Sequence, residues 1–105
     1  MKWQLQPTAT TMTLSDWLRR IGADDRLMPT HVSLFTALLI CWQRSGYANP
    51  FNVTRKTLMG YAKIASIATY HKCIRELDEY GYIRYCPSYH PTEGSRVYWP
   101  FLADP

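Results

Sequence analysis

Residues 63 to 86 read KIASIATYHKCIRELDEYGYIRYC, and this stretch decides the fold. Four of its apolar side chains follow the i, i+3, i+4, i+7 spacing that places them on one face of a helix: Tyr70, Cys73, Ile74 and Leu77. Ser66 is suited to cap the start of this helix, and Gly81 is suited to the left-handed residue that ends it. The pattern predicts a helix over about 67–80 whose apolar face lies in a core.

The opposite face of the predicted helix is polar and basic. It has a small residue near its start and three possible hydrogen-bond donors further along: Ala68, His71, Lys72 and Arg75. An acid-free stretch surrounds it, because no Asp or Glu occurs between Asp25 and Glu76, whereas seven basic residues do. A surface of one sign attracts phosphates from a distance. We interpret the stretch as the footprint of a polyanion, the alternative being a solvated surface that lacks acids.

The composition indicates one globular domain. The chain has 105 residues, of which 47% are hydrophobic and 19% charged, a balance that excludes a disordered chain. No apolar run approaches the roughly 20 residues of a membrane span, and the N-terminus lacks the apolar region of a secretory signal. The three cysteines are an odd number, which agrees with reduced thiols, so we expect a cytoplasmic protein.

Three further helices are predicted on the N-terminal side of this stretch. Thr13 and Asp16 stand in the capping-box relation at the start of an amphipathic helix over about 14–21. Thr30 is expected to cap a second helix, HVSLFTALLICWQRSG, which is apolar on two sides and therefore central. Thr54 is expected to cap a third helix, RKTLMGYA, which ends only about three or four residues before the helix described above. Two helices joined so closely are typical of a helix-turn-helix.

Two strands are predicted after the last helix. The segments YIRYC and SRVYWPF alternate with period two and are rich in aromatic and β-branched residues, so they predict paired strands around the loop PSYHPTEG. Tyr85, Val97 and Trp99 are expected in the core. The segment YANPFNV, before the third helix, contains an Asn-Pro turn and at most a very short strand. The predicted order is four helices followed by a hairpin.

This order, from Thr30 to Trp99, resembles the winged helix-turn-helix family. The resemblance is carried by the capping Ser66, a Thr three residues later, an apolar residue, polar residues, then an apolar pair followed by Leu77, and the passage through Gly81 into a strand. It implies a mainly α fold with a small β-hairpin (α+β), here with an N-terminal helical extension. The implied organisation is a tail and amphipathic helix over 1–28, the winged helix-turn-helix domain over 29–101, and a C-terminal tail over 102–105.

The resemblance also implies sequence-specific binding of double-stranded DNA, by a transcriptional regulator or by a replication-associated factor of a mobile element. The helix after Ser66 would lie in the major groove, and the start of the preceding helix would cross the DNA backbone. The implied DNA-binding residues are Thr54, Arg55, Lys56, Lys63, Ser66, Ile67, Ala68, Thr69, His71, Lys72, Arg75, Arg84 and Arg96. The wing departs from the family pattern, because its tip has no Lys or Arg and contains Glu93.

No group of residues indicates catalysis, a cofactor or a small-molecule ligand. The His/Cys cluster comprises His71, Cys73, Cys86 and His90; it contains no C-x-x-C pair, and its helical members point to different sides, so no metal is expected. The alternative to DNA binding is a winged helix that binds another protein. We predict a homodimer to which the apolar stripe of the helix over about 14–21 contributes, the alternative being that this stripe packs on its own domain.

Overall fold

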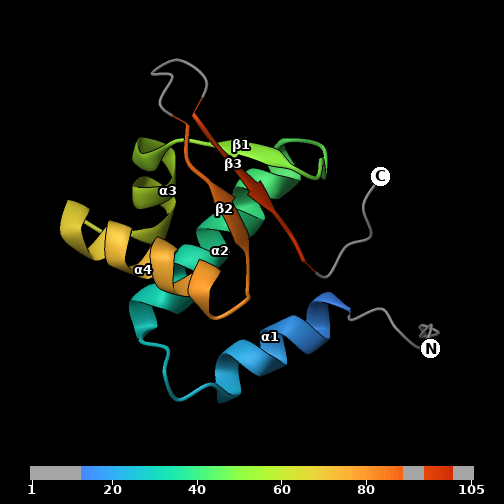
Figure 1. The fold of residues 1–105 in the computed structure, drawn as a ribbon, viewed down its shortest axis with the longest axis vertical. Helices are drawn as coiled ribbons and strands as arrows, with labels where there is room; N and C mark the ends of the chain where they lie inside the picture. Colours follow the sequence, from blue (N-terminus) through green and yellow to red (C-terminus); the bar gives the residue numbers. More distant parts are fainter. Residues whose placement is uncertain (1–12, 89–93, 101–105) are drawn as a thin grey trace.

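The computed structural model describes residues 13–88 and 94–100, and these form four helices and a small antiparallel sheet of three strands (Figure 1). The elements are α1 (Leu14–Ala23), α2 (Pro29–Arg44), β1 (Phe51–Val53), α3 (Arg55–Ala62), α4 (Ile67–Glu79), β2 (Arg84–Cys86) and β3 (Ser95–Tyr98). The chain is therefore mainly helical with a small sheet, as the α+β prediction states. None of the described helices is long and apolar enough to cross a membrane.

The sheet contains one strand more than the predicted hairpin. β3 lies between β1 and β2 and pairs antiparallel with both, and Val97 is the register partner of Phe51 on one side and of Tyr85 on the other. β1 is the very short strand that the YANPFNV segment allowed. Phe51 and Val53 are buried while Asn52 is exposed, the alternation of a strand with one face on the core.

A glycine permits the close approach of β3 to β1. Gly94 has a φ of +69°, and a Cβ at this position would lie 2.5 Å from the carbonyl oxygen of Val53. An L side chain is strained at such a φ and would also collide with the neighbouring backbone. The chain can enter β3 along this path only because residue 94 has no side chain.

α2 forms the centre of the molecule, with α3 and α4 beside it (Figure 1). Its buried side chains are Leu34, Phe35, Ala37, Leu38 and Cys41, together with His31. Thr30 was expected to cap this helix, and that expectation was wrong. The helix begins at Pro29, whose fixed φ and missing N–H suit the first helical position, so Met28 is the capping residue. One apolar residue of this helix, Val32 in its first turn, is exposed rather than buried.

Aromatic rings from distant segments close the core against α2. Val97 and Trp99 are buried as predicted, and the Trp99 ring packs edge-on against Phe35 at 5.3 Å between centroids. Tyr85 is only half-buried, because its hydroxyl reaches the Ser95 Oγ at 3.1 Å near the sheet edge. Tyr85 nevertheless packs against the hydrophobic core, so the expectation that it lies in the core is met only in part.

α1 packs on its own chain. Its predicted capping box is present, with the Thr13 amide donating to Asp16 and the Asp16 amide donating to the Thr13 Oγ1. Trp17 and Ile21 are buried in the same hydrophobic core as the residues of α2 and α4. Of the two alternatives that the sequence left open for this stripe, packing within the chain is therefore observed, although Leu18 remains 46% exposed. Homodimerisation stays a prediction.

Candidate nucleic-acid interface

α3 and α4 form two consecutive helices joined by residues 63–66. The predicted caps are present, since the Thr54 Oγ1 accepts from the Thr57 amide and the Ser66 Oγ accepts from the Thr69 amide, each at 3.2 Å. Lys63, which follows α3, has a left-handed φ of 62°, which reverses the chain between the helices. α3 and α4 are thus closely linked, as the sequence predicted.

The two faces of α4 differ as the periodicity predicted. Its buried side chains are Tyr70, Cys73, Ile74 and Leu77. Ala68, His71, Lys72 and Arg75 are all exposed on the other side. Leu77 has no exposed surface, so the inner face anchors the helix in the core, while the side chains of the outer face are in contact with solvent.

The beginning of α4 presents apolar and small side chains to solvent. Ile67 is 49% exposed, and Ala65, Ser66 and Ala68 beside it are also exposed, whereas Thr69 is half-buried. The Ser66 Oγ caps the helix by accepting from the Thr69 amide, and its hydroxyl hydrogen can still be donated to an external acceptor. This end of the helix can approach another surface closely.

The structure divides the seven basic residues of the acid-free stretch into two groups. Arg26 donates through Nε and Nη2 to Asp24 at 2.9 and 2.7 Å, and Arg44 donates to the Tyr61 hydroxyl. These two guanidinium groups therefore have partners away from α4. The remaining five are exposed on α3, on α4 or on the linker between them: Arg55, Lys56, Lys63, Lys72 and Arg75.

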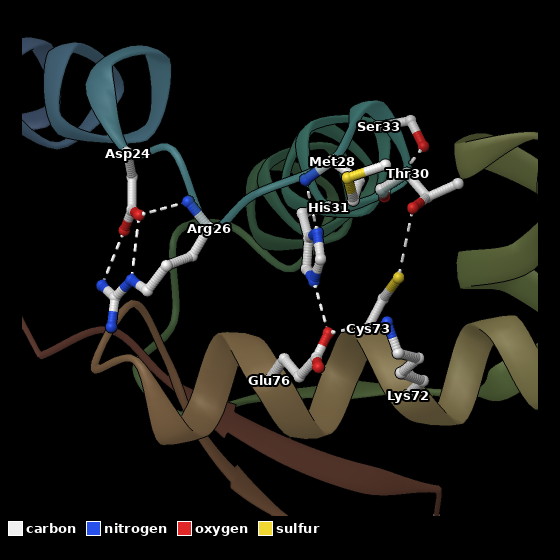
Figure 2. A network of polar contacts seen from close by, with 9 residues as sticks. All are labelled: Asp24, Arg26, Met28, Thr30, His31, Ser33, Lys72, Cys73 and Glu76. Carbon is white, nitrogen blue, oxygen red and sulfur yellow. Dashed lines mark hydrogen bonds and ion pairs between the residues drawn. The ribbon is translucent and has the colours of Figure 1, made fainter.

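A polar network that the sequence did not reveal joins α2 to α4 (Figure 2). His31 is only 1% exposed and points from the first turn of α2 toward α4. The Met28 amide donates to its Nδ1 at 2.8 Å, and its Nε2 lies 2.8 Å from the Glu76 Oε1. Because a backbone amide only donates, Nδ1 must accept, so the hydrogen is on Nε2 and is donated to the carboxylate.

Glu76 connects this buried imidazole to the exposed face of α4. Its Oε1 also lies 3.6 Å from the Nζ of Lys72, one helical turn earlier. The hydrogen bond from His31 and the charge of Lys72 lower the pKa of Glu76 below its ordinary value, so the carboxylate is ionised at neutral pH. Lys72 thus has an acidic neighbour, whereas Arg75 has no ion pair with any described residue.

The sequence contains a signal for only one part of this network, the contact between His31 and the Met28 amide. A His three residues after Met28 can reach back to the amide that precedes a helix, as a Glu or Gln does in a capping box. Nothing in the local pattern connects it with Glu76, which is 45 residues away. A second contact between the same elements joins the Cys73 Sγ to the Thr30 Oγ1 at 3.3 Å.

Arg84 and Arg96 lie on one side of the sheet. In the register of β2 and β3, Arg84 is opposite Tyr98 and Arg96 is opposite Cys86, so both arginines project from the face opposite to that of the buried Val97. Both side chains are exposed, and the Arg84 guanidinium lies over the Tyr98 ring at 5.3 Å. The tip of the predicted wing, including Glu93 and His90, lies outside the described residues.

Within residues 13–88 and 94–100, no three His, Cys, Asp or Glu side chains are grouped as metal ligands. Cys41, Cys73 and Cys86 are free thiols. Comparison of the chain with protein-family models, with curated proteins and with solved structures found no match. The functional interpretation therefore rests on the geometry of α3, α4 and the sheet.

Proposed function

We propose that the protein binds double-stranded DNA as a winged helix-turn-helix, with the exposed face of α4 in the major groove. Two features support this proposal: the element order α2, β1, α3, α4, β2, β3 and the sheet order β1-β3-β2. In this sheet β3 lies between the other two strands, as the return strand of the proposed wing. α1 is then an N-terminal extension that packs on the domain. We infer a role in transcription or in the replication of a mobile element.

The single observation that carries the proposal is the exposed basic surface of α3, α4 and their linker. The outer face of the amphipathic α4 presents two exposed cations, Lys72 and Arg75, and the closely linked α3 begins with the exposed Arg55 and Lys56. Cationic side chains on the surface of a helix-turn-helix are suited to phosphates and to the acceptor groups of guanine.

The residues of this surface have different proposed roles. Arg75, which has no ion pair among the described residues, is suited to a guanine or a phosphate. Ile67 and Ala68 at the start of α4 leave room for close approach and can contact a thymine methyl group. The amides at the starts of α3 and α4 and the cations Arg55, Lys56 and Lys63 are suited to phosphates.

The test is the salt dependence of binding to a fluorescent duplex of random sequence, measured by anisotropy. If about four to six phosphates are contacted, the logarithm of the affinity falls with the logarithm of the salt concentration with a slope of about −4 to −5. Arg75→Gln is expected to make the slope shallower by about 0.9. Arg19→Gln removes the same charge from α1, where Arg19 pairs with Asp16, and is expected to leave the slope unchanged.

A second candidate function is the binding of another protein, and one observation favours it. A groove of about 510 Å³ between α1 and α2 is lined mainly by apolar residues, among them Ile21, Leu27, Met28 and Val32, and also by Asp24 and Ser33. Met28 and Val32 are 56% and 44% exposed and both line this groove, and adjoining exposed apolar side chains are typical of a protein-binding surface. Absence of DNA binding even at low salt would favour this function over the first.

A further inference from the structure

Glu76 is the acidic residue next to the basic face of α4, and its position is determined from inside the protein. Its side chain is 21% exposed, and its Oε1 accepts from the fully buried His31. The same oxygen lies 3.6 Å from the Nζ of Lys72, whose side chain is 59% exposed. The carboxylate is therefore attached to the core on one side and faces a candidate DNA-binding cation on the other (Figure 2).

His31 is itself held in one orientation. Its Nδ1 accepts from the Met28 amide at the start of α2, so that only Nε2 can donate to Glu76. A buried, fully hydrogen-bonded ring has few alternative rotamers, and it fixes the carboxylate that it contacts. An exposed glutamate on the same helix, Glu79, has no ion pair with any described residue.

We propose that Glu76 is a positioning residue of the DNA-binding face, one that holds Lys72 through a shared carboxylate oxygen and reduces the contribution of Lys72 to sequence-independent phosphate binding. This inference rests on the proposed function. A lysine paired with a carboxylate has to give up that partner, or share it, before it neutralises a phosphate. Arg75, one turn along and without an ion pair to any described residue, then supplies more of the affinity than Lys72 does.

The test is a double-mutant cycle in the full chain, with random-sequence duplex DNA as the probe. Glu76→Gln keeps a carbonyl oxygen that accepts from His31 but removes the charge beside Lys72. At about 0.1 M salt it is expected to strengthen binding about threefold to tenfold and to make the salt slope steeper by about 0.9. In a Lys72→Gln background, most of this gain is expected to disappear, because the freed cation is no longer there.

Glu79→Gln is the matched control, since it removes an equal charge from the same helix. Glu79→Gln is expected to strengthen DNA binding less than Glu76→Gln does, and by the same factor with and without Lys72. An equal gain from Glu76→Gln in both backgrounds would overturn the proposal, because it would identify Glu76 as a general source of repulsion. Thermal melting of each variant checks that the domain remains folded.

A comparison that leaves Glu76 intact gives an independent result. Lys72→Gln is expected to weaken DNA binding less than Arg75→Gln does, whereas equal or larger losses from Lys72→Gln would contradict the proposal. Wild-type protein with no salt-dependent DNA binding would overturn the proposed function and this inference together. Wild-type binding without coupling between positions 72 and 76 would overturn the inference alone.

Discussion

The ring of Trp17 in α1 meets the ring of Tyr82, which follows α4, edge-on at 5.5 Å between centroids, and this contact attaches the N-terminal helix to the rest of the domain. Both side chains are buried. The Tyr82 hydroxyl extends the attachment by donating to the Asp24 Oδ2 at 2.8 Å, just beyond the end of α1.

Trp17→Ala is therefore expected to lower the free energy of unfolding by about 3 kcal/mol, measured by urea denaturation. Leu18→Ala removes a neighbouring but exposed side chain of the same helix and is expected to change it by less than about 0.5 kcal/mol. Equal effects of the two substitutions would mean that α1 does not pack on the domain in solution.

Light scattering at tens of micromolar tests the separate prediction of a homodimer.

The carboxylates of Asp24 and Glu76 make stability depend on acid. Hydrogen bonds from Arg26, and then from Tyr82, lower the pKa of Asp24, and the hydrogen bond from His31 lowers that of Glu76. A carboxylate with a lowered folded-state pKa stabilises the fold above its ordinary pKa, near 4, and loses that contribution as the pH falls through the folded-state pKa. The melting temperature of the wild type is expected to fall below about pH 4, and Asp24→Asn is expected to show a weaker dependence there.

Substitutions of the buried His31 can distinguish the contributions of its two hydrogen bonds to stability. His31→Ala leaves both the Met28 amide and the Glu76 carboxylate without this partner, and is expected to cost about 2 to 4 kcal/mol of unfolding free energy. Asn places an acceptor near the position of Nδ1, and Gln places a donor near the position of Nε2. His31→Asn and His31→Gln are each expected to recover part of the unfolding free energy that His31→Ala loses, as measured by chemical denaturation. If Asn and Gln were no better than Ala, ring packing rather than hydrogen bonding would be the function of His31.

The sequence predicted the helices and their caps well, because these depend on local chemistry. Thr13, Thr54 and Ser66 each cap the helix that the spacing of apolar residues indicated. The start of α2 was mistaken because Thr30 has a good capping side chain, whereas Pro29 favours the first helical position more strongly.

Long-range relationships were the part that the sequence could not specify. The pairing of Phe51 with Val97 depends on how two distant segments meet, and the contact of His31 with Glu76 depends on the packing of α2 against α4. Of the candidate site, periodicity alone predicted the exposed face of α4. The hydrogen bonds of Arg26 with Asp24 and of Arg44 with Tyr61 were not predicted from the sequence, and only the structure shows them.

Gly94 is expected to be the least replaceable glycine among the described residues. Gly94→Ala introduces a Cβ against the Val53 carbonyl at a positive φ, and is expected to destabilise the protein by about 1 to 3 kcal/mol. Gly22, within α1, has open space around it and no positive φ, so Gly22→Ala is expected to stabilise by about 0.5 to 1 kcal/mol. Thermal melts of the two variants should therefore shift in opposite directions.

The two faces of α4 should separate by mutation into one that maintains the fold and one that binds DNA. Leu77→Ala is expected to cost about 2 to 5 kcal/mol of unfolding free energy, because Leu77 is fully buried. Replacing both Lys72 and Arg75 with Ala is expected to leave the melting temperature nearly unchanged, since both side chains are exposed.

The same double replacement is expected to weaken DNA binding, by about 1 to 3 kcal/mol for a residue that contacts a base and with a shallower salt slope for one that contacts a phosphate. Arg84→Ala and Arg96→Ala change cations on the exposed face of the sheet and should have smaller effects. Anisotropy titrations at two salt concentrations measure all of these variants. If the α4 double variant bound like the wild type while either sheet variant abolished binding, the sheet and not α4 would be the principal DNA contact.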